Sequence, residues 1–188
     1  MAHRVCPWWL GYFLASPIRR WIEIRDPETF LKSYVCAGMT VLEPGPGMGF
    51  FTIPLARLVG SAGKVVAVDI QPKMLQVLRN RAAKAGLQDR LETHLAGPRS
   101  LGVDGLRGTV DFALLYAMVH EVPEPQALFR EVAESLKPGG KVLFVEPAGH
   151  VDASHFDEEA GFARQAGLRE TGRPEVPKNR AVLFSKPA

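Results

Sequence analysis

Hydrophobic and polar positions along the chain form two kinds of segment that alternate. Short apolar runs such as KVVAV at 64–68 and KVLFV at 141–145 are typical of strands buried on both faces of a parallel sheet. Longer stretches carry apolar residues three or four positions apart, as amphipathic helices do. This pattern predicts strands at 39–43, 64–70, 90–96, 110–116, 141–147, 167–173 and 180–186, and helices at 27–35, 50–60, 71–86, 125–137 and 155–167.

Turn residues mark the ends of several predicted helices. Asp26 and Pro27 supply an N-cap and a first-turn proline for the helix at 27–35. The helix at 71–86 has a proline at its start and a glycine at its end, and Pro138-Gly139-Gly140 is expected to stop the helix at 125–137.

Strands that alternate with helices predict parallel βαβ units and hence a doubly wound, Rossmann-like α/β fold. The last two strands have no helix between them, so we expect an antiparallel hairpin at the sheet edge. No repeat or linker is visible, which favours one domain over 1–188. Within it we expect an N-terminal helical lid or extension at 1–36 and an α/β core at 37–188.

Composition narrows the class of protein. The chain has 188 residues and a net charge of +3, with both signs mixed along its length, which is too weak a bias for nucleic-acid binding. No apolar stretch is long enough to span a bilayer. Cys6 and Cys36 stand apart from any CxxC or histidine-rich motif, which favours a reduced, cytoplasmic setting. The apolar segment VCPWWLGYFLA has too few preceding charges for a typical signal peptide, so we do not expect export.

The stretch VLEPGPGMGFFTIPLA at 41–56 is predicted to be a strand, a glycine-rich turn and the start of a helix. The turn contains Gly45, Gly47 and Gly49, which is a GxGxG spacing. The dinucleotide fingerprint is GxGxxG. Reading that fingerprint from Gly45 puts Phe50 at the third glycine, and reading it from Gly47 puts Thr52 there. The spacing therefore disfavours NAD.

Two acidic residues give a second indication of the ligand. Glu43 lies two positions before the first glycine, where a carboxylate would repel a pyrophosphate but suit an ammonium group. S-adenosylmethionine (SAM) carries an ammonium and a sulfonium and no phosphate. Asp69 ends the second strand, where it can accept hydrogen bonds from ribose hydroxyls, and Ile70 can pack on adenine. The alternative for Asp69 is that it only caps the next helix.

These features together resemble the class I SAM-dependent methyltransferases. The resemblance rests on ExGxGxG from Glu43, an acidic end to the second strand, and LKPGGKVLFVE before and through the fifth strand, and it covers 39 to about 186. From DFALLYAMVHEV to LKPGGKVLFVEP the sequence is similar to methyltransferases of quinone precursors and other small molecules.

The resemblance implies a seven-stranded sheet of order 3-2-1-4-5-7-6 with strand 7 antiparallel. It also implies SAM as cofactor, S-adenosylhomocysteine as product, and Tyr116 near the methionine end of the cofactor. Family members often carry an Asp after the third strand that holds the adenine amino group. This chain has Gly97 there, followed by Pro98, so a backbone contact from these residues is expected instead.

Candidates for handling the acceptor follow the fourth and fifth strands. They are Tyr116, His120, Glu121, Glu146 and His150, and ligands of open α/β sheets bind outside the carboxyl ends of the strands. His120 is the first choice for a base because its ordinary pKa is near neutrality. The alternatives are that His120 only fixes a turn and that Glu146 only holds the loop with His150. No short ligand spacing supports a metal site.

The N-terminus is rich in aromatic residues, with all three tryptophans within residues 8–21. A helix at 8–24 is predicted there, ending near Arg19 and Arg20. It is expected to act as a lid over the substrate, as ordinary core, or as a peripheral membrane contact.

The sequence thus predicts an enzyme that transfers a methyl group from SAM to a small apolar or aromatic acceptor, with no nucleic-acid partner and no stable membrane insertion. Two other functions remain open: a SAM-binding protein without transferase activity, and a nicotinamide-dependent oxidoreductase.

Overall fold

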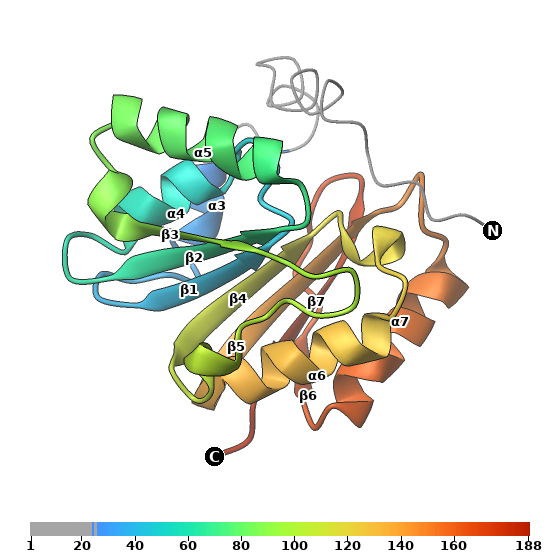
Figure 1. The fold of residues 1–188 in the computed structure, drawn as a ribbon. Coiled ribbons are helices and arrows are strands. Elements are labelled where there is room, and N and C mark those ends of the chain that lie inside the picture. Colours follow the sequence, from blue (N-terminus) through green and yellow to red (C-terminus); the bar gives the residue numbers. More distant parts are fainter. Residues whose placement is uncertain (1–23, 25) are drawn as a thin grey trace. The chain divides into compact units, whose positions relative to one another are not determined.

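The computed structural model describes Ile24 and residues 26–188 (Figure 1). These residues form two compact units, an N-terminal unit that ends at Pro98 and a C-terminal unit that begins at Arg99. The strand order is β3-β2-β1-β4-β5-β7-β6, with β7 antiparallel, which confirms the predicted fold class. The predicted helix at 8–24 lies outside the described residues except for Ile24. The division at 36 and 37 therefore stays a prediction.

The N-terminal unit carries three parallel strands with helices packed on them. β1 pairs with β2, and β2 pairs with β3. The apolar runs of β1 and β2 are almost completely buried, as expected for strands covered on both faces. The elements are α3 (Pro27–Leu31), β1 (Thr40–Pro44), α4 (Thr52–Leu58), β2 (Lys64–Asp69), α5 (Pro72–Lys84), the 3-10 helix η1 (Gln88–Arg90) and β3 (Leu91–Leu95).

Local sequence explains where these helices begin. Asp26 caps α3, because its Oδ1 accepts hydrogen bonds from the backbone N–H groups of Glu28 and Thr29 at 3.1 and 3.2 Å. Proline is the first residue of both α3 and α5, as predicted. The buried face of α5 is Met74, Leu75, Leu78 and Ala82, the spacing of an amphipathic helix.

The C-terminal unit contains the other four strands. β4 and β5 are parallel, and β7 pairs antiparallel with both β5 and β6, so the predicted terminal hairpin is confirmed. Helices α6 and α7 lie side by side (Figure 1). The elements are η2 (Asp104–Leu106), β4 (Val110–Tyr116), η3 (Val119–Glu121), α6 (Pro125–Ser135), β5 (Leu136–Pro147), α7 (Ala153–Gln165), β6 (Arg169–Gly172) and β7 (Asn179–Ser185).

Three aromatic rings form the centre of this unit. Phe144 of β5 meets Phe129 of α6 edge-on at 5.4 Å between ring centroids and stacks on Phe156 of α7 at 4.8 Å. All three rings are buried. These contacts fix both helices against β5, whose carboxyl end carries Glu146.

The boundary between α6 and β5 differs from the prediction. The helix ends at Ser135 instead of 137, and β5 begins at Leu136 instead of 141. Pro138 disfavours helical backbone at the residue before it. The following glycines then pair with Lys186, since Gly139 N–H donates to the Lys186 carbonyl at 2.9 Å and Lys186 N–H donates to the Gly140 carbonyl at 2.8 Å.

Candidate functional site

The glycine-rich turn follows β1 in the backbone conformation that the sequence pattern predicted. Gly45, Gly47 and Gly49 all have positive φ, at 67°, 54° and 87°. A Cβ on Gly49 would lie 2.5 Å from the Leu78 side chain, so the turn packs tightly on α5. No described atom lies within 4 Å of a Cβ placed on Gly47, so the backbone is open to a ligand at that point.

Glu43 is a buried carboxyl beside this turn, 3% exposed on β1. Its Oε2 has no hydrogen-bond partner among the described residues, and the same is true of the buried Thr52 hydroxyl. Burial raises the pKa of Glu43 to about 7, and the charge of Asp69 adds to the rise. The nearby Thr52 hydroxyl acts in the opposite direction, although the two groups do not meet the geometry of a hydrogen bond. A buried carboxyl oxygen without a partner is unfavourable unless a ligand compensates it.

Asp69 ends β2 at the same edge as Glu43, because β1 and β2 are parallel. Its Oδ1 accepts a hydrogen bond from the Gln71 N–H at 2.8 Å. The N-cap of α5 is Gln71, so Asp69 supports the turn into that helix without being its N-cap residue. The alternative that Asp69 caps the next helix is therefore correct in part: its Oδ1 atom supports the turn before α5, although Asp69 is not the N-cap residue.

Two exposed apolar side chains lie at the neighbouring strand ends. Ile70 is 44% exposed and Leu95 is 59% exposed, and the residue pair Asp69 and Leu95 is in register between β2 and β3. Gly97 and Pro98 follow Leu95 and are exposed as well. The structure thus brings the residues predicted for adenine to one edge of the N-terminal unit, and it adds Leu95, which sequence reasoning missed.

Arg81 is a second residue that sequence reasoning missed. From α5 it donates a hydrogen bond to the Met48 carbonyl in the glycine-rich turn. The guanidinium is partly buried, and that burial lowers the pKa of Arg81. Nothing in the sequence indicated that Arg81 reaches the turn 33 residues earlier.

In the C-terminal unit, His120 and Glu146 form a hydrogen-bonded pair. His120 Nδ1 lies 2.6 Å from Oε2 of Glu146, whose side chain is fully buried. The other oxygen, Oε1, accepts hydrogen bonds from the backbone N–H groups of Val119 at 2.8 Å and His120 at 3.3 Å. Glu146 therefore holds the whole η3 turn and orients the imidazole. The two alternatives from the sequence, that His120 only fixes a turn and that Glu146 only holds the loop with His150, did not include a hydrogen bond between these two residues.

The electrostatics of the pair favour a basic imidazole. The hydrogen bond to Glu146 raises the pKa of His120 above its ordinary value, and the charges of Glu146, Glu121 and Glu159 act in the same direction against the effect of burial. His120 Nε2 lies 4.0 Å from Glu121. The His150 ring lies close to that of His120, with ring centroids 6.4 Å apart.

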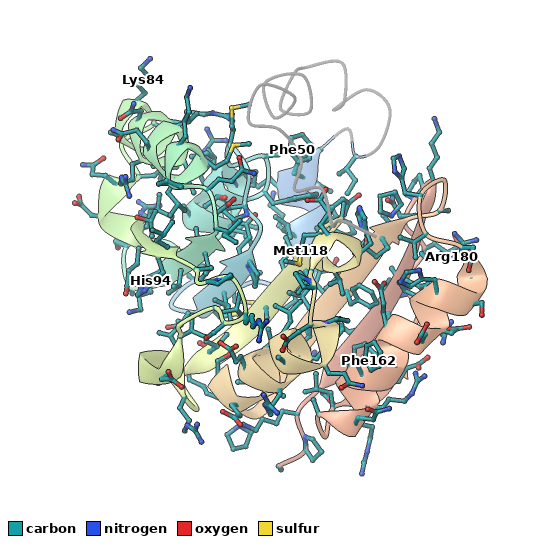
Figure 2. The ribbon with its side chains drawn as sticks, turned by 45° about the vertical axis from the view of Figure 1, so that its right-hand side comes forward. Phe50, Lys84, His94, Met118, Phe162 and Arg180 are labelled. Carbon is teal, nitrogen blue, oxygen red and sulfur yellow. The ribbon has the colours of Figure 1, made fainter. Side chains whose placement is uncertain are left out.

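The end of β4 carries the remaining predicted residue. Tyr116 is buried, and the next residue, Ala117, has a φ of 53°, which is uncommon for a residue with a Cβ. The Ala117 N–H donates to the Val145 carbonyl at 2.8 Å. Met118 in the turn that follows is labelled in Figure 2.

A cavity of about 540 Å³ lies in the C-terminal unit between the start of α7 and the β6–β7 loop. Arg180, which is labelled in Figure 2, lines this cavity. Its guanidinium donates to the carbonyls of Ala148 and Val151 at 3.1 and 2.7 Å. Phe156 and Val176 supply part of its apolar wall, and none of the predicted site residues lines it.

Within the described part of the chain, no group of three His, Cys, Asp or Glu side chains could hold a metal ion. No helix among those residues has both the length and the hydrophobicity needed to cross a bilayer.

Comparison with known proteins identifies the family. Residues 41–140 match the family model described as a methyltransferase domain, so the chain belongs to the methyltransferase domain family. The structure resembles a SAM-dependent methyltransferase from Aquifex aeolicus with a TM-score of 0.84 and 27% identity, over 96% of this chain and 99% of that one. Both findings confirm the class I SAM-dependent methyltransferase prediction and identify SAM as the cofactor.

The curated relatives carry quinone-biosynthesis names. A ubiquinone/menaquinone biosynthesis C-methyltransferase from Hahella chejuensis is 36% identical over 63% of this chain and 47% of its own length. A ubiquinone biosynthesis O-methyltransferase from Xanthomonas axonopodis is 32% identical over 57% of this chain and 42% of its own length. The chain thus spans about half the length of the curated relatives it matches. A [4+2]-cyclase shares the fold alone, with a TM-score of 0.73 at 14% identity.

Proposed function

We propose that this protein transfers the methyl group of SAM to a small apolar or aromatic acceptor. The observation that carries the proposal is the buried Glu43 carboxyl, whose Oε2 has no partner among the described residues beside an open glycine-rich turn. A cationic ligand without phosphate matches that site. The same carboxyl opposes the pyrophosphate of a nicotinamide cofactor.

The N-terminal unit supplies the groups that we assign to cofactor binding. Glu43 would accept hydrogen bonds from the ammonium group of SAM, and Asp69 would accept hydrogen bonds from its ribose hydroxyls. Ile70 would pack against the adenine, with backbone groups of Gly97 and Pro98 in place of the family's usual Asp. Gly45, Gly47 and Gly49 would let the backbone approach the ligand closely. When bound, SAM supplies an electrophilic methyl group, and the sulfonium sulfur that carries this methyl is a good leaving group.

His120 is our candidate for the base. Glu146 fixes Nδ1 as the hydrogen-bonded nitrogen, which leaves Nε2 to accept the proton that the acceptor loses. The raised pKa of His120 makes it a better proton acceptor than a free imidazole. Glu146 acts through His120 and is a positioning residue in this scheme. The assignment of Tyr116 to the cofactor stays a prediction.

The relatives support an acceptor of the quinone-precursor type. Their names include both a C-methyltransferase and an O-methyltransferase of quinone biosynthesis. We therefore propose a ring with a phenolic oxygen or an activated carbon as the methyl acceptor. Loss of the phenolic proton generates the nucleophile in either reaction, which is consistent with a base at His120.

Calorimetry with SAM, S-adenosylhomocysteine and NADH tests the cofactor assignment. We expect binding of the first two ligands and none of NADH; binding of NADH without SAM would reject the proposal. Incubation with methyl-labelled SAM and a set of hydroxylated aromatic acceptors tests the activity. Labelled product is expected with the native chain and strongly reduced with His120→Gln. SAM binding without transfer to any acceptor in the set would favour the non-catalytic alternative.

A further inference from the structure

Arg180 of β7 holds the turn at 147–151, which connects β5 to α7. Its Nη1 donates hydrogen bonds to the carbonyls of Ala148 and Val151, at 3.1 and 2.7 Å. These two carbonyls lie before and after His150 in the chain, so one guanidinium nitrogen fixes the backbone on both sides of that residue. A guanidinium is planar and always charged, and it therefore presents such donors in a fixed geometry.

The same turn is held by further backbone contacts. The Ala148 N–H donates to the Lys178 carbonyl at 3.0 Å. The N–H groups of His150 and Val151 donate to the Pro147 carbonyl at 3.0 and 2.9 Å. Lys178 has a φ of 62°, which is uncommon for a residue with a Cβ and persists where the surrounding structure fixes it. The turn is therefore held at several points although its His150 side chain is exposed.

His150 is the titratable side chain that this turn presents. It makes no hydrogen bond or ion pair among the described residues, but its ring centroid lies 6.4 Å from that of His120. An imidazole reaches an oxygen about 4 Å from its own centre, the sum of the ring radius and one hydrogen bond. Two rings at the observed separation can therefore reach the same hydroxyl group or two adjacent ones.

We propose that His150 binds the acceptor's oxygen together with His120, and that Arg180 is the residue that positions His150 for this contact. This inference rests on the proposed role of His120 as the base. His120 takes the proton of the acceptor's hydroxyl group, and His150 forms a hydrogen bond with the same oxygen or with an adjacent one on the ring. Arg180 does not touch the acceptor and acts through the turn.

Arg173 provides a matched control for Arg180. Both arginines line the cavity beside α7. The Arg173 guanidinium bonds to the carboxylates of Glu170 at 2.8 Å and Asp157 at 3.0 Å, and it has no hydrogen bond to the turn that carries His150. Removal of either guanidinium should lower the free energy of unfolding. A change at His150 is expected for Arg180 alone.

NMR spectroscopy of the full chain without ligands tests the positioning role. The measured quantity is the nuclear Overhauser effect between the ring protons of His120 and His150. We expect it in the native protein and in Arg173→Met, and we expect it to be severalfold weaker in Arg180→Met. Arg180→Lys should restore part of it, because an ammonium group also donates to carbonyls. Equal effects in the native protein and in Arg180→Met would overturn the positioning role.

Binding of phenol, catechol and hydroquinone to the complex with S-adenosylhomocysteine tests the contact with the acceptor. At least one of these probes should perturb the imidazole signals of both histidines. It should bind severalfold more weakly to His150→Gln and to Arg180→Met, with the affinity for SAM unchanged. The double variant should bind no more weakly than the weaker single variant, because both changes remove one contact. Additive losses would overturn the claim that Arg180 acts through His150.

His150→Gln keeps the test valid if Arg180→Met fails to fold, because the side chain that it changes is exposed. A probe that perturbs His120 but binds to His150→Gln with native affinity would overturn the inference and leave the base role of His120 in place. If no probe perturbs either imidazole, the proposed acceptor class fails and this inference fails with it. If His150→Gln weakens binding but His120→Gln transfers methyl groups at the native rate, the contact at His150 stands and the base role fails.

Discussion

At the scale of single residues, Glu43 illustrates how burial converts a common side chain into a selective one. The glycine-rich turn alone would accept several adenosine-containing ligands. In the proposed cofactor site, the buried Glu43 carboxyl, whose pKa is raised to about 7, would give that turn a preference for a cation. The ligand's positive charge would restore the ionised form that burial disfavours.

We therefore predict that SAM affinity rises with pH between about pH 5.5 and 7.5, since the ammonium group binds the ionised form of Glu43, while the ligand's own α-amino group loses its proton only at about 7.7–8.0. Glu43→Gln should weaken binding by roughly tenfold or more and remove most of this pH dependence. Calorimetry across the range measures both effects.

Glu28→Gln is the matched control, because it removes a carboxylate of the same unit whose ion pair with Arg57 is long, at 3.7 Å, and partly exposed. It should leave SAM affinity and its pH dependence unchanged. Native-like binding by Glu43→Gln would show that the cofactor placement is wrong.

Arg81 gives a second prediction at this scale. Its guanidinium holds the Met48 carbonyl, and a lysine has a different reach and cannot offer the same planar set of donors. We expect Arg81→Lys to weaken SAM binding severalfold with little change in the free energy of unfolding. Arg79→Lys on the same helix, where the arginine donates a surface hydrogen bond to the Thr93 hydroxyl, should bind SAM normally. Equal affinities for the two variants would exclude a positioning role.

The difference between predicted and missed residues has a physical reason. Glu43 and Asp69 stand next to strand ends and a glycine-rich turn, so local spacing along the sequence predicted their placement. Arg81 of α5 and the buried Glu159 of α7 depend on which face of a helix meets a distant segment. Helical periodicity shows that a position is near the core, but not which polar group it meets there.

At the scale of elements, the carboxyl ends of β4 and β5 position His120. The η3 turn is held by Glu146, which accepts two of its backbone N–H groups and the imidazole. The proposed proton acceptor, His120, is thus attached to the rigid centre of the unit, since β5 packs through Phe144 on both helices. A turn held only by its own backbone would position the imidazole less well.

Glu146→Gln should weaken this attachment. The charge-assisted hydrogen bond to Nδ1 is the largest cause of the raised pKa of His120, so the substitution should shift the His120 titration to lower pH. The free energy of unfolding near pH 6 should fall by roughly 1–3 kcal/mol. NMR titration and urea unfolding measure these effects.

His150→Gln serves as the control for Glu146→Gln, because it changes an exposed ring near His120 without touching this hydrogen bond. An unchanged His120 titration in Glu146→Gln would contradict the assigned geometry.

Element boundaries show where sequence prediction reaches its limit. Asp26 and Pro27 predicted the start of α3, and Pro72 predicted the start of α5, because the effects of these residues are local. The start of β5 at Leu136 could not be predicted from the same residues, because it depends on pairing of Gly139 and Gly140 with Lys186, almost fifty residues later. Because of this long-range pairing, residues 136–140, which the sequence predicted as a helix end and a loop, belong to strand β5.

At the scale of the whole molecule, the groups with raised pKa values are distributed over both units. Glu43 belongs to the N-terminal unit, and Glu159 and His120 belong to the C-terminal unit. Each binds a proton more tightly in the folded chain than in the unfolded chain. Such groups contribute most to stability while they stay protonated, so their contribution falls as the pH rises through neutrality.

This gives the last prediction, that the free energy of unfolding falls as the pH rises from about 5 to 8. The folded pKa values of Glu43 and Glu159 are raised from 4.5 to about 7, so the folded chain binds more protons than the unfolded chain between those values. Each group can contribute a loss of roughly 3 kcal/mol across that window. The raised pKa of His120 acts in the same direction, because its contribution is present below its ordinary pKa and is lost as the pH rises through the folded value.

Urea unfolding at intervals across this range measures the slope. Carboxyls with lowered pKa values act in the opposite direction, but at pH values below this window, and they are Asp26, Glu92 and Asp152. Glu43→Gln and Glu159→Gln should each flatten the profile, and SAM should restore stability near pH 7.5 in the native chain but much less in Glu43→Gln. A stability that is constant or rises from pH 5 to 8 would mean that these carboxyls are not held in the buried state that the structure shows.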